Sequence, residues 1–257
     1  MSYYKEVIGE YIGTFILVLF GCGSVASAVL LGTLGSLLEV ALVWGMGVAI
    51  AIFATRNICP AHLNPAVSIA MSAFGKLPGR KLPLYITGQF LGAFSAAALL
   101  YFIFGGAITG YETANNIVRG SIESNQSAIM FGEFFPNPGF TDSISITALQ
   151  AMILEGIGTF ILVFVILRLN EKSDQIDNFT PILIGLTVTL IICLIAPYTQ
   201  SGLNPARDFG PRMFAYFAGW GNAAFPAVPF SFFTVYILAP IIGGVLAGLL
   251  DKVLSNR

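Results

Sequence analysis

The chain has 257 residues, of which 56% are hydrophobic and 10% are charged. A soluble domain carries about 25% charged residues, so this composition indicates a protein whose surface largely faces lipid. The net charge of −1 leaves no general basic surface for nucleic acid, and the single histidine, His62, excludes a multi-histidine metal site. We expect no metal and no other cofactor.

Six apolar segments are each about long enough to cross the roughly 30 Å hydrocarbon core of a bilayer. In chain order they cover residues 7–31, 38–55, 82–104, 144–167, 179–196 and 230–250. Residues from about 107 to 142 are polar and rich in Gly, Asn, Ser and Pro, so we expect a long connection that does not cross the membrane. Residues 197–202 are expected to break the fifth segment, because they begin with Pro197.

Basic residues predict the orientation of these segments. If the N-terminus is cytoplasmic, nine of the twelve Lys and Arg residues lie on the cytoplasmic side, and only Arg119, Arg207 and Arg212 lie outside. We therefore expect a multi-pass protein of the plasma membrane with both its N- and C-termini in the cytoplasm.

Two tripeptides, Asn64-Pro65-Ala66 and Asn204-Pro205-Ala206, each follow an apolar segment. Asn is a strong helix N-cap and Pro is favoured at the first helical position, so each tripeptide predicts a helix start. The helices that follow, residues 64–74 and 204–216, are too short to cross a bilayer. Interrupted segments at matching places in the two halves of a membrane protein indicate a site at the membrane midplane.

An internal repeat supports this interpretation, since residues 13–18 recur unchanged as residues 158–163. Glu10 and Glu155 precede the two copies at the same distance. Three spans per half is an odd number, so the second half must be inverted relative to the first. The sequence predicts an all-α membrane protein of six transmembrane helices and two re-entrant half-helices. It would form one pore domain of two repeats, residues 1–143 and 144–257.

Irregular backbone at membrane depth survives only where it is buried in protein or lines a water-filled cavity. The segments before the two half-helices are such backbone, and we expect their carbonyl groups to line a narrow path. They comprise Pro60, Ala61, His62 and Leu63 before the first half-helix, and Gln200, Ser201 and Gly202 before the second.

The two half-helices would meet at their N-termini, each of which carries roughly half a positive charge. Asn64 and Asn204 can cap these helices through oxygen and offer an amide N–H to the lumen. Such a site repels cations and donates hydrogen bonds to a hydroxyl or water oxygen. The alternative is that the tripeptides only open two buried helices.

A few charged residues lie within the apolar segments: an arginine beside an aspartate in the second half-helix, and one glutamate in each half of the chain. Arg207 lies about one turn into the second half-helix, where a charge is costly and indicates a functional site, here a second barrier to cations and protons. Alternatively Arg207 is structural and pairs with Asp208. Glu10 and Glu155 are expected to accept hydrogen bonds from the adjacent broken loops, although a proton relay is a second interpretation.

The sequence resembles the aquaporin superfamily, the major intrinsic proteins, and within it the glycerol facilitators or aquaglyceroporins of bacteria. The resemblance is carried by residues 62–67, 117–121, 202–212 and 218–222, and it covers nearly the whole chain. It implies a homotetramer in the lipid bilayer with one pore per subunit. In this family an aspartate directly after the arginine of the second motif is typical of the glycerol-conducting branch, and Asp208 matches that position.

By motif, the four positions of that family's outer constriction fall on Trp44, Ile192, Ser201 and Arg207. Trp44 matches the glycerol facilitators, and the absence of a histidine at the second position is unlike the water-selective members. Glycerol facilitators resemble one another in having Gly at the second position and Phe at the third, whereas this chain has Ile192 and Ser201. That combination is similar to plant nodulin-like intrinsic proteins. Tyr236 stands where the glycerol branch usually has proline.

We therefore expect a passive channel for glycerol and other small uncharged solutes, with some water, that excludes ions and protons. One alternative is a wider channel for undissociated lactic acid, urea, hydrogen peroxide or dihydroxyacetone, and another is mainly a water channel. A different class would be a proton-coupled secondary transporter that uses Glu10 or Glu155. We expect no enzyme and no catalytic residue, because the sequence shows no nucleophile–base pair, metal cluster or phosphate loop.

Overall fold

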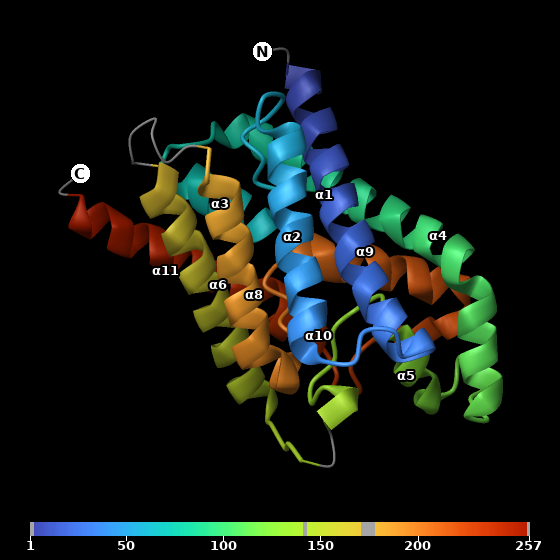
Figure 1. Cartoon of the computed structure of the whole chain (residues 1–257). Helices are drawn as coiled ribbons and strands as arrows, with labels where there is room; N and C mark the ends of the chain where they lie inside the picture. Colours follow the sequence, from blue (N-terminus) through green and yellow to red (C-terminus); the bar gives the residue numbers. More distant parts are fainter. Residues whose placement is uncertain (1–2, 141–142, 171–177, 256–257) are drawn as a thin grey trace.

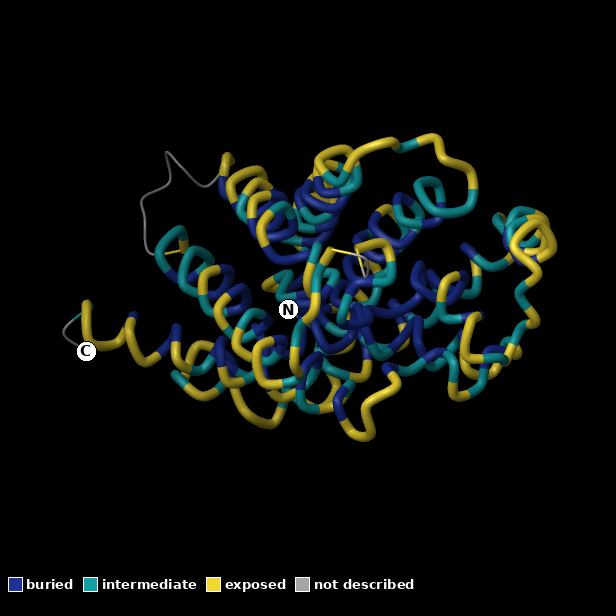
Figure 2. The backbone as a smooth tube through the Cα atoms, turned by 90° about the horizontal axis from the view of Figure 1, so that it is seen from below, coloured by how far each residue is buried: buried dark blue, intermediate teal, exposed yellow. Residues whose placement is uncertain are grey.

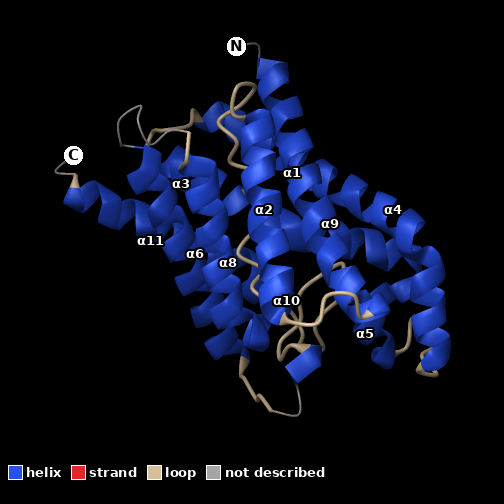
Figure 3. Cartoon of the chain, viewed as in Figure 1, coloured by secondary structure: helices blue, strands red, loops and turns tan. Residues whose placement is uncertain are grey.

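The computed structural model describes residues 3–140, 143–170 and 178–255, and within these ranges the chain forms helices and loops without any strand (Figure 3). Six helical segments of this part are long and apolar enough to cross a membrane. They are α1 (Tyr3–Ala26) with η1 (Ser27–Leu31), α2 (Leu37–Thr55), α4 (Leu82–Ala114) after η2 (Gly79–Lys81), α6 (Ala148–Asn170), α8 (Thr180–Thr199), and α10 (Ser231–Phe233) with η7 (Thr234–Leu238) and α11 (Ala239–Leu254). The predicted all-α fold with six spans is confirmed (Figure 1).

Two further helices, α3 (Pro65–Ala73) and α9 (Pro205–Ala215), are the half-helices. At 1.5 Å per residue they are about 14 and 17 Å long, which is roughly half of a hydrocarbon core. The chain continues from α9 into η5 (Tyr216–Trp220) and η6 (Gly221–Ala224). Both half-helices start at the proline that follows the predicted asparagine cap.

The long helices approach one another at glycines, where the backbones touch. A Cβ atom on Gly92 of α4 would lie 2.3 Å from the carbonyl oxygen of Tyr11 in α1. A Cβ atom on Gly243 of α11 would lie 2.1 Å from the carbonyl oxygen of Gly156 in α6. Small residues at such crossings let membrane helices pack closely.

The packing of the two halves follows the same scheme. Helix α1 packs on α4 as α6 packs on α11, and half-helix α9 contacts α4 as α3 contacts α11. Helices α2 and α8 pack against each other between the halves. The division into inverted repeats at residues 143 and 144 stays a prediction.

Buried residues lie on the inner faces of the helices and exposed residues on the outer faces (Figure 2). The outward side chains include large apolar groups, such as Phe102, which is 85% exposed, and Leu194, which is 73% exposed. A belt of exposed apolar side chains around long helices is what a bilayer covers.

Helix α4 does not end near residue 104 as predicted but continues to Ala114. The Gly and Thr content of this part is typical of a loop, and tertiary contacts override it. The hydroxyl of Thr113 donates to the carbonyl of Thr109, at 2.8 Å, within the helix. Glu112 near its end pairs with Arg119 at 2.8 Å and accepts a hydrogen bond from Ser127 at 2.8 Å.

Two other predicted boundaries differ. The fourth span was expected from residue 144, but α6 begins at Ala148. Helix α8 continues through Pro197 to Thr199, because a proline in the last turn removes only one helical hydrogen bond. The N–H of Gln200 still donates to the carbonyl of Ala196, at 2.9 Å, and closes the helix.

The connection after α4 is compact and partly buried. It contains η3 (Ile122–Ser124), α5 (Asn125–Ala128) and η4 (Pro138–Phe140). Arg119 lies over the ring of Trp220, with its Cζ atom 4.3 Å from the ring centroid, and the Trp220 indole N–H donates to Ser127 at 2.9 Å. Residues 127–135 are buried, and the Phe131 ring contacts the rings of Phe214 in α9 and Trp220. The connection therefore packs onto the end of α9 instead of extending into solvent.

Candidate functional site

Each half-helix begins with the predicted asparagine cap. Asn64 has an extended backbone, and its side-chain oxygen accepts a hydrogen bond from the Ala66 N–H at 2.8 Å. The Asn204 oxygen accepts from the N–H groups of Ala206 and Arg207 at 3.0 and 3.2 Å. These bonds satisfy N–H groups that a helix start leaves without partners.

The amide nitrogens of the two asparagines cross between the half-helices. Asn64 Nδ2 donates to the Leu203 carbonyl at 3.0 Å, and Asn204 Nδ2 donates to the Leu63 carbonyl at 2.8 Å. One N–H of each side chain is thus used between the loops, an exchange that no sequence pattern predicts. Each amide keeps a second N–H for another acceptor.

The loops before the half-helices contain non-glycine residues in the left-handed region. Their φ angles are 51° and 52° at Ala61 and Leu63, and 61°, 63° and 55° at Gln200, Ser201 and Leu203. Each such residue costs about 1–2 kcal/mol, so the loops need partners that stabilise them.

The two buried glutamates are those partners. Glu10 accepts hydrogen bonds from the N–H groups of His62 and Leu63 at 2.9 and 2.7 Å. Glu155 accepts from the N–H groups of Gly202 and Leu203 at 2.9 and 2.8 Å. These are the contacts that a support role requires.

Side chains complete both carboxylate sites. Gln89 donates to Glu10 at 2.8 Å and to Ser68 at 2.9 Å, and the ring nitrogen Nδ1 of His62 lies 3.2 Å from the Ser68 hydroxyl. Thr199 donates its hydroxyl to Glu155 at 2.6 Å. His62 is therefore held within a polar network beside the first loop.

The loops and half-helices line a cavity of about 170 Å³ that begins near Arg56 and Pro181 and ends at Trp44 and Arg207. All four residues predicted for the outer constriction line this one cavity, as do both asparagines. Five of the six further ladder residues line it: Pro60, Ala61, His62, Leu63 and Gly202.

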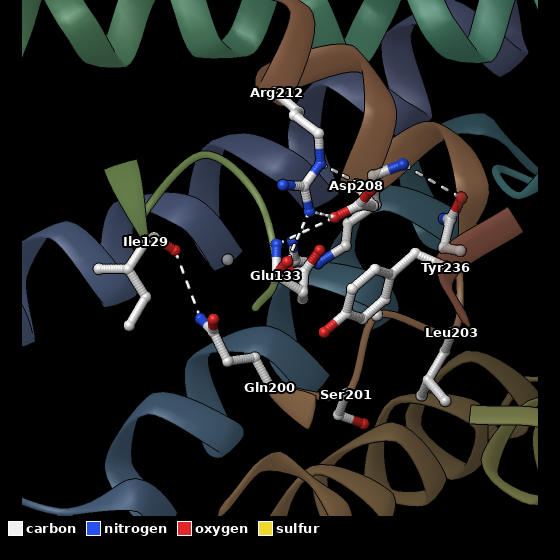
Figure 4. A network of polar contacts seen from close by, with 12 residues as sticks. Ile129, Glu133, Gln200, Ser201, Leu203, Asp208, Arg212 and Tyr236 are labelled. Carbon is white, nitrogen blue, oxygen red and sulfur yellow. Dashed lines mark hydrogen bonds and ion pairs between the residues drawn. The ribbon is translucent and has the colours of Figure 1, made fainter. Parts of the chain in front are cut away.

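Gln200 departs from the predicted ladder, since it does not line the cavity and Leu203 does. The Gln200 side chain instead binds the connection after α4. Its oxygen accepts from the Phe134 N–H at 2.7 Å, and its nitrogen lies 3.4 Å from the Ile129 carbonyl (Figure 4).

Trp44 and Arg207 are in direct contact at the end of the cavity. The Arg207 Cζ atom lies 4.1 Å from the Trp44 ring centroid, which is a cation–π contact. The indole lies against Gly21 of α1, where an added Cβ atom would be 2.1 Å from Trp44 Cε3. Gly21 thus leaves the space that Trp44 fills, a role that the sequence pattern did not reveal.

Ser201 and Ile192 complete this end of the cavity. Both are buried, and the Ser201 hydroxyl has no hydrogen-bond partner among the described residues. This part of the cavity lining therefore combines an aromatic ring, an aliphatic side chain, a guanidinium and a hydroxyl, and its role as a constriction stays a prediction.

Arg207 does not pair with Asp208, the structural alternative considered from the sequence. Arg207 forms an ion pair with Glu133, a residue of the connection after α4. Asp208 pairs with Arg212, and Arg212 Nε lies 3.0 Å from Asp208 Oδ2. Sequence reasoning missed Glu133, although an acidic residue within the apolar stretch 128–135 was a readable signal.

A family model described as "Major intrinsic protein" matches residues 1–251. The chain belongs to the major intrinsic protein family. The chain is therefore a multi-pass membrane protein, in agreement with its six apolar spans. Over the described residues, no group of three or more His, Cys, Asp or Glu side chains could hold a metal ion.

Several major intrinsic proteins are similar over most of their length. The chain is 40% identical to the "Glycerol uptake facilitator protein" of Pseudomonas aeruginosa over 261 aligned residues, which cover 100% of this chain and 90% of the relative. It is 41% identical to the protein of the same name from Haemophilus influenzae, over 95% of this chain and 91% of the relative. It is 36% identical to a propanediol uptake facilitator of Citrobacter freundii, with 98% and 92% covered.

A solved structure of this family is also similar. The X-ray structure of the aquaglyceroporin from Plasmodium falciparum matches with a TM-score of 0.83 and 30% sequence identity. The match covers 99% of this chain and 98% of that one. The names of these relatives describe facilitators and a porin, so the family resemblance stated from the sequence is confirmed, and membership of a class of enzymes is not indicated.

Proposed function

We propose that the chain is a passive channel for glycerol and other small uncharged solutes, with some water, that excludes ions and protons. The observation that carries this proposal is the cavity in which Asn64 and Asn204 meet, with Trp44 and Arg207 at its end. The names of the relatives, which describe uptake of glycerol and propanediol, support the same class of solute.

Solutes would pass in single file between an apolar side of the cavity and a side that offers hydrogen bonds. The carbon side of a polyol slides along Trp44 and Ile192, because burial of apolar area on these side chains offsets lost hydration. Its hydroxyl groups exchange hydrogen bonds with Arg207, the loop carbonyls and the remaining amide N–H groups of Asn64 and Asn204. The opposed N-termini of α3 and α9 disfavour cations at the same place.

The assembly and its place in the cell belong to the same proposal. The exposed apolar belt and the distribution of basic residues support a plasma-membrane protein with cytoplasmic termini. Family membership supports a homotetramer in which each subunit carries its own pore.

A proton-coupled transporter is the weaker alternative. Both oxygens of Glu10 accept a hydrogen bond from the backbone, and so do both oxygens of Glu155. Each carboxylate therefore already serves as the acceptor that holds its loop in place, a role that needs no change of protonation. A pore, moreover, needs no coupling ion.

The test is stopped-flow light scattering on vesicles that contain the purified protein, with sucrose and then glycerol as the osmolyte. We expect rapid shrinkage in both and fast re-swelling only in glycerol. Glycerol re-swelling no faster than in empty vesicles would contradict the proposal. Imposed proton gradients should leave the glycerol rate unchanged, whereas a coupled transporter would respond to them.

Two substitutions on α8 supply a matched comparison. Ile192→Trp adds bulk inside the cavity and should slow glycerol strongly, while Leu194→Trp changes a side chain that is 73% exposed on the outer face. We expect the Leu194 variant to match the wild type. Equal slowing in both would place the path somewhere other than along Ile192.

A further inference from the structure

Glu133 and Arg207 form a buried pair of opposite charges at the outer end of the cavity. Their side chains are 0% and 7% exposed. A buried carboxylate is costly unless a positive group accompanies it, and the same holds for a guanidinium. The Glu133 oxygen Oε2 has no hydrogen-bond partner among the described residues, so Arg207 is its main stabilising neighbour.

The backbone of Glu133 is fixed by the acidic and basic residues of α9. Its N–H donates to Asp208 Oδ1 at 2.9 Å, and its carbonyl accepts from Arg212 Nη2 at 2.6 Å (Figure 4). A Cβ atom on the preceding residue, Gly132, would lie 2.7 Å from Arg212 Cζ. The chain therefore approaches α9 closely here and delivers one carboxylate to Arg207.

The charges of this cluster balance. Arg207 and Arg212 are positive, and Asp208 and Glu133 are negative, in contact with one another. Two opposite charges in contact largely cancel each other's field at the distance of a passing ion. With its charge matched by Glu133, the guanidinium can act mainly as a hydrogen-bond donor to a passing solute. The barrier role that the sequence assigns to Arg207 stays a prediction.

We propose that Glu133 is a specificity-determining residue that neutralises Arg207 and so sets the charge of the outer constriction. The inference rests on the proposed pore, which passes through the constriction. It follows that removing Arg207 alone exposes a lone carboxylate that attracts cations. Removing both charges restores a neutral constriction.

A charge-removal cycle in vesicles tests this, with potassium and proton leak measured by fluorescent indicators. Arg207→Val should raise the cation leak on the order of tenfold or more. The double variant Arg207→Val with Glu133→Gln should return to within about twofold of the wild type, because no unpaired charge remains. Glu123→Gln, an exposed carboxylate of the same connection, is the control and should change nothing.

The outcomes separate two origins of ion exclusion. If Arg207 were itself the barrier, the double variant would leak as much as Arg207→Val, and the proposal would be overturned. Equal amounts of inserted protein are verified by gel filtration before each measurement. Glycerol re-swelling of the same vesicles is recorded in parallel, so that failure of the proposed function shows as absent glycerol flux, independently of ion leak.

Glu133→Gln alone decides the question if Arg207→Val does not insert. This variant leaves one uncompensated positive charge at the constriction. Uptake of nitrate, a small anion, should then rise relative to uptake of potassium, at least several-fold. An unchanged ratio of the two uptakes would overturn the proposal.

Discussion

Asn64 and Asn204 each cap their own helix and bind the loop of the other. The amide nitrogen of Asn64 lies 3.0 Å from the Leu203 carbonyl, and that of Asn204 lies 2.8 Å from the Leu63 carbonyl. One side chain thus satisfies a backbone group in each half of the molecule. The geometry at the centre of the cavity depends on both at once.

Replacing Asn64 by Asp tests this exchange. Aspartate keeps an oxygen for the Ala66 N–H but faces the Leu203 carbonyl with a second oxygen, so a buried donor is lost and two acceptors meet. We expect a loss of about 1–3 kcal/mol in stability and a rise in cation leak. Thermal unfolding in detergent and ion uptake by vesicles measure the two effects. Asn222→Asp, at an exposed position, should stay within about 0.5 kcal/mol of the wild type.

Gly21→Ala should displace the aromatic wall. The new Cβ atom would lie 2.1 Å from Trp44 Cε3, and an indole ring cannot bend away from it. We expect glycerol permeability to fall several-fold relative to water permeability, because Trp44 lines the cavity and must leave its present position there. Gly23→Ala on the same helix is the control, since its nearest neighbour is a Leu100 methyl group at 3.4 Å. Equal losses in both variants would mean that α1 is merely sensitive to added bulk.

Glu155→Gln should weaken the second loop. The Gly202 and Leu203 N–H groups reach different oxygens of Glu155, and glutamine replaces one of these oxygens by an NH2 donor, so one of the two N–H groups then faces a donor. An unsatisfied buried N–H costs about 1–3 kcal/mol, so we expect the free energy of unfolding to fall by that amount and the glycerol flux to fall with it. Thermal unfolding in detergent and re-swelling of vesicles measure the two effects. Glu39→Gln is the comparison, because glutamine can also accept the Ser36 N–H of the capping box there. Wild-type stability in Glu155→Gln would refute the support role.

Ser201→Phe should narrow the predicted constriction at the wall where the small side chain of Ser201 now lies. Ser201 already has a φ of 63°, so phenylalanine there keeps the left-handed backbone that serine adopts, and its ring enters the cavity. We expect glycerol to be favoured over five-carbon polyols, measured as a ratio of re-swelling rates. Ser201→Ala removes a hydroxyl that has no partner among the described residues and should change the ratio little. The opposite shift in the phenylalanine variant would mean that this position lies off the solute path.

The sequence was informative wherever one local signal determines the structure. Apolar length predicts a span, and an asparagine before a proline predicts a capped helix, which is why α3 and α9 begin where expected. Glu10 and Glu155 were readable because a charge within an apolar run needs a partner close to it in the fold.

What the sequence could not give depends on contacts between distant residues. Helix α4 extends to Ala114, and Glu112 near its end contacts Arg119 and Ser127 of the following connection, whereas propensity alone ends the helix earlier. The partner of Arg207 is 74 residues away in the chain, on a connection whose composition is typical of an exposed loop. The outward turn of Gln200 likewise follows from the position of Phe134.

The exchange of hydrogen bonds between the two loops also bears on biogenesis. Synthesis proceeds from the N-terminus, so the first three spans and α3 enter the membrane while the second half does not yet exist. At that stage the Leu63 carbonyl lacks its donor, and the Asn64 amide lacks its acceptor. The first re-entrant segment can reach its final form only after the second has inserted, so insertion of α9 completes both halves together.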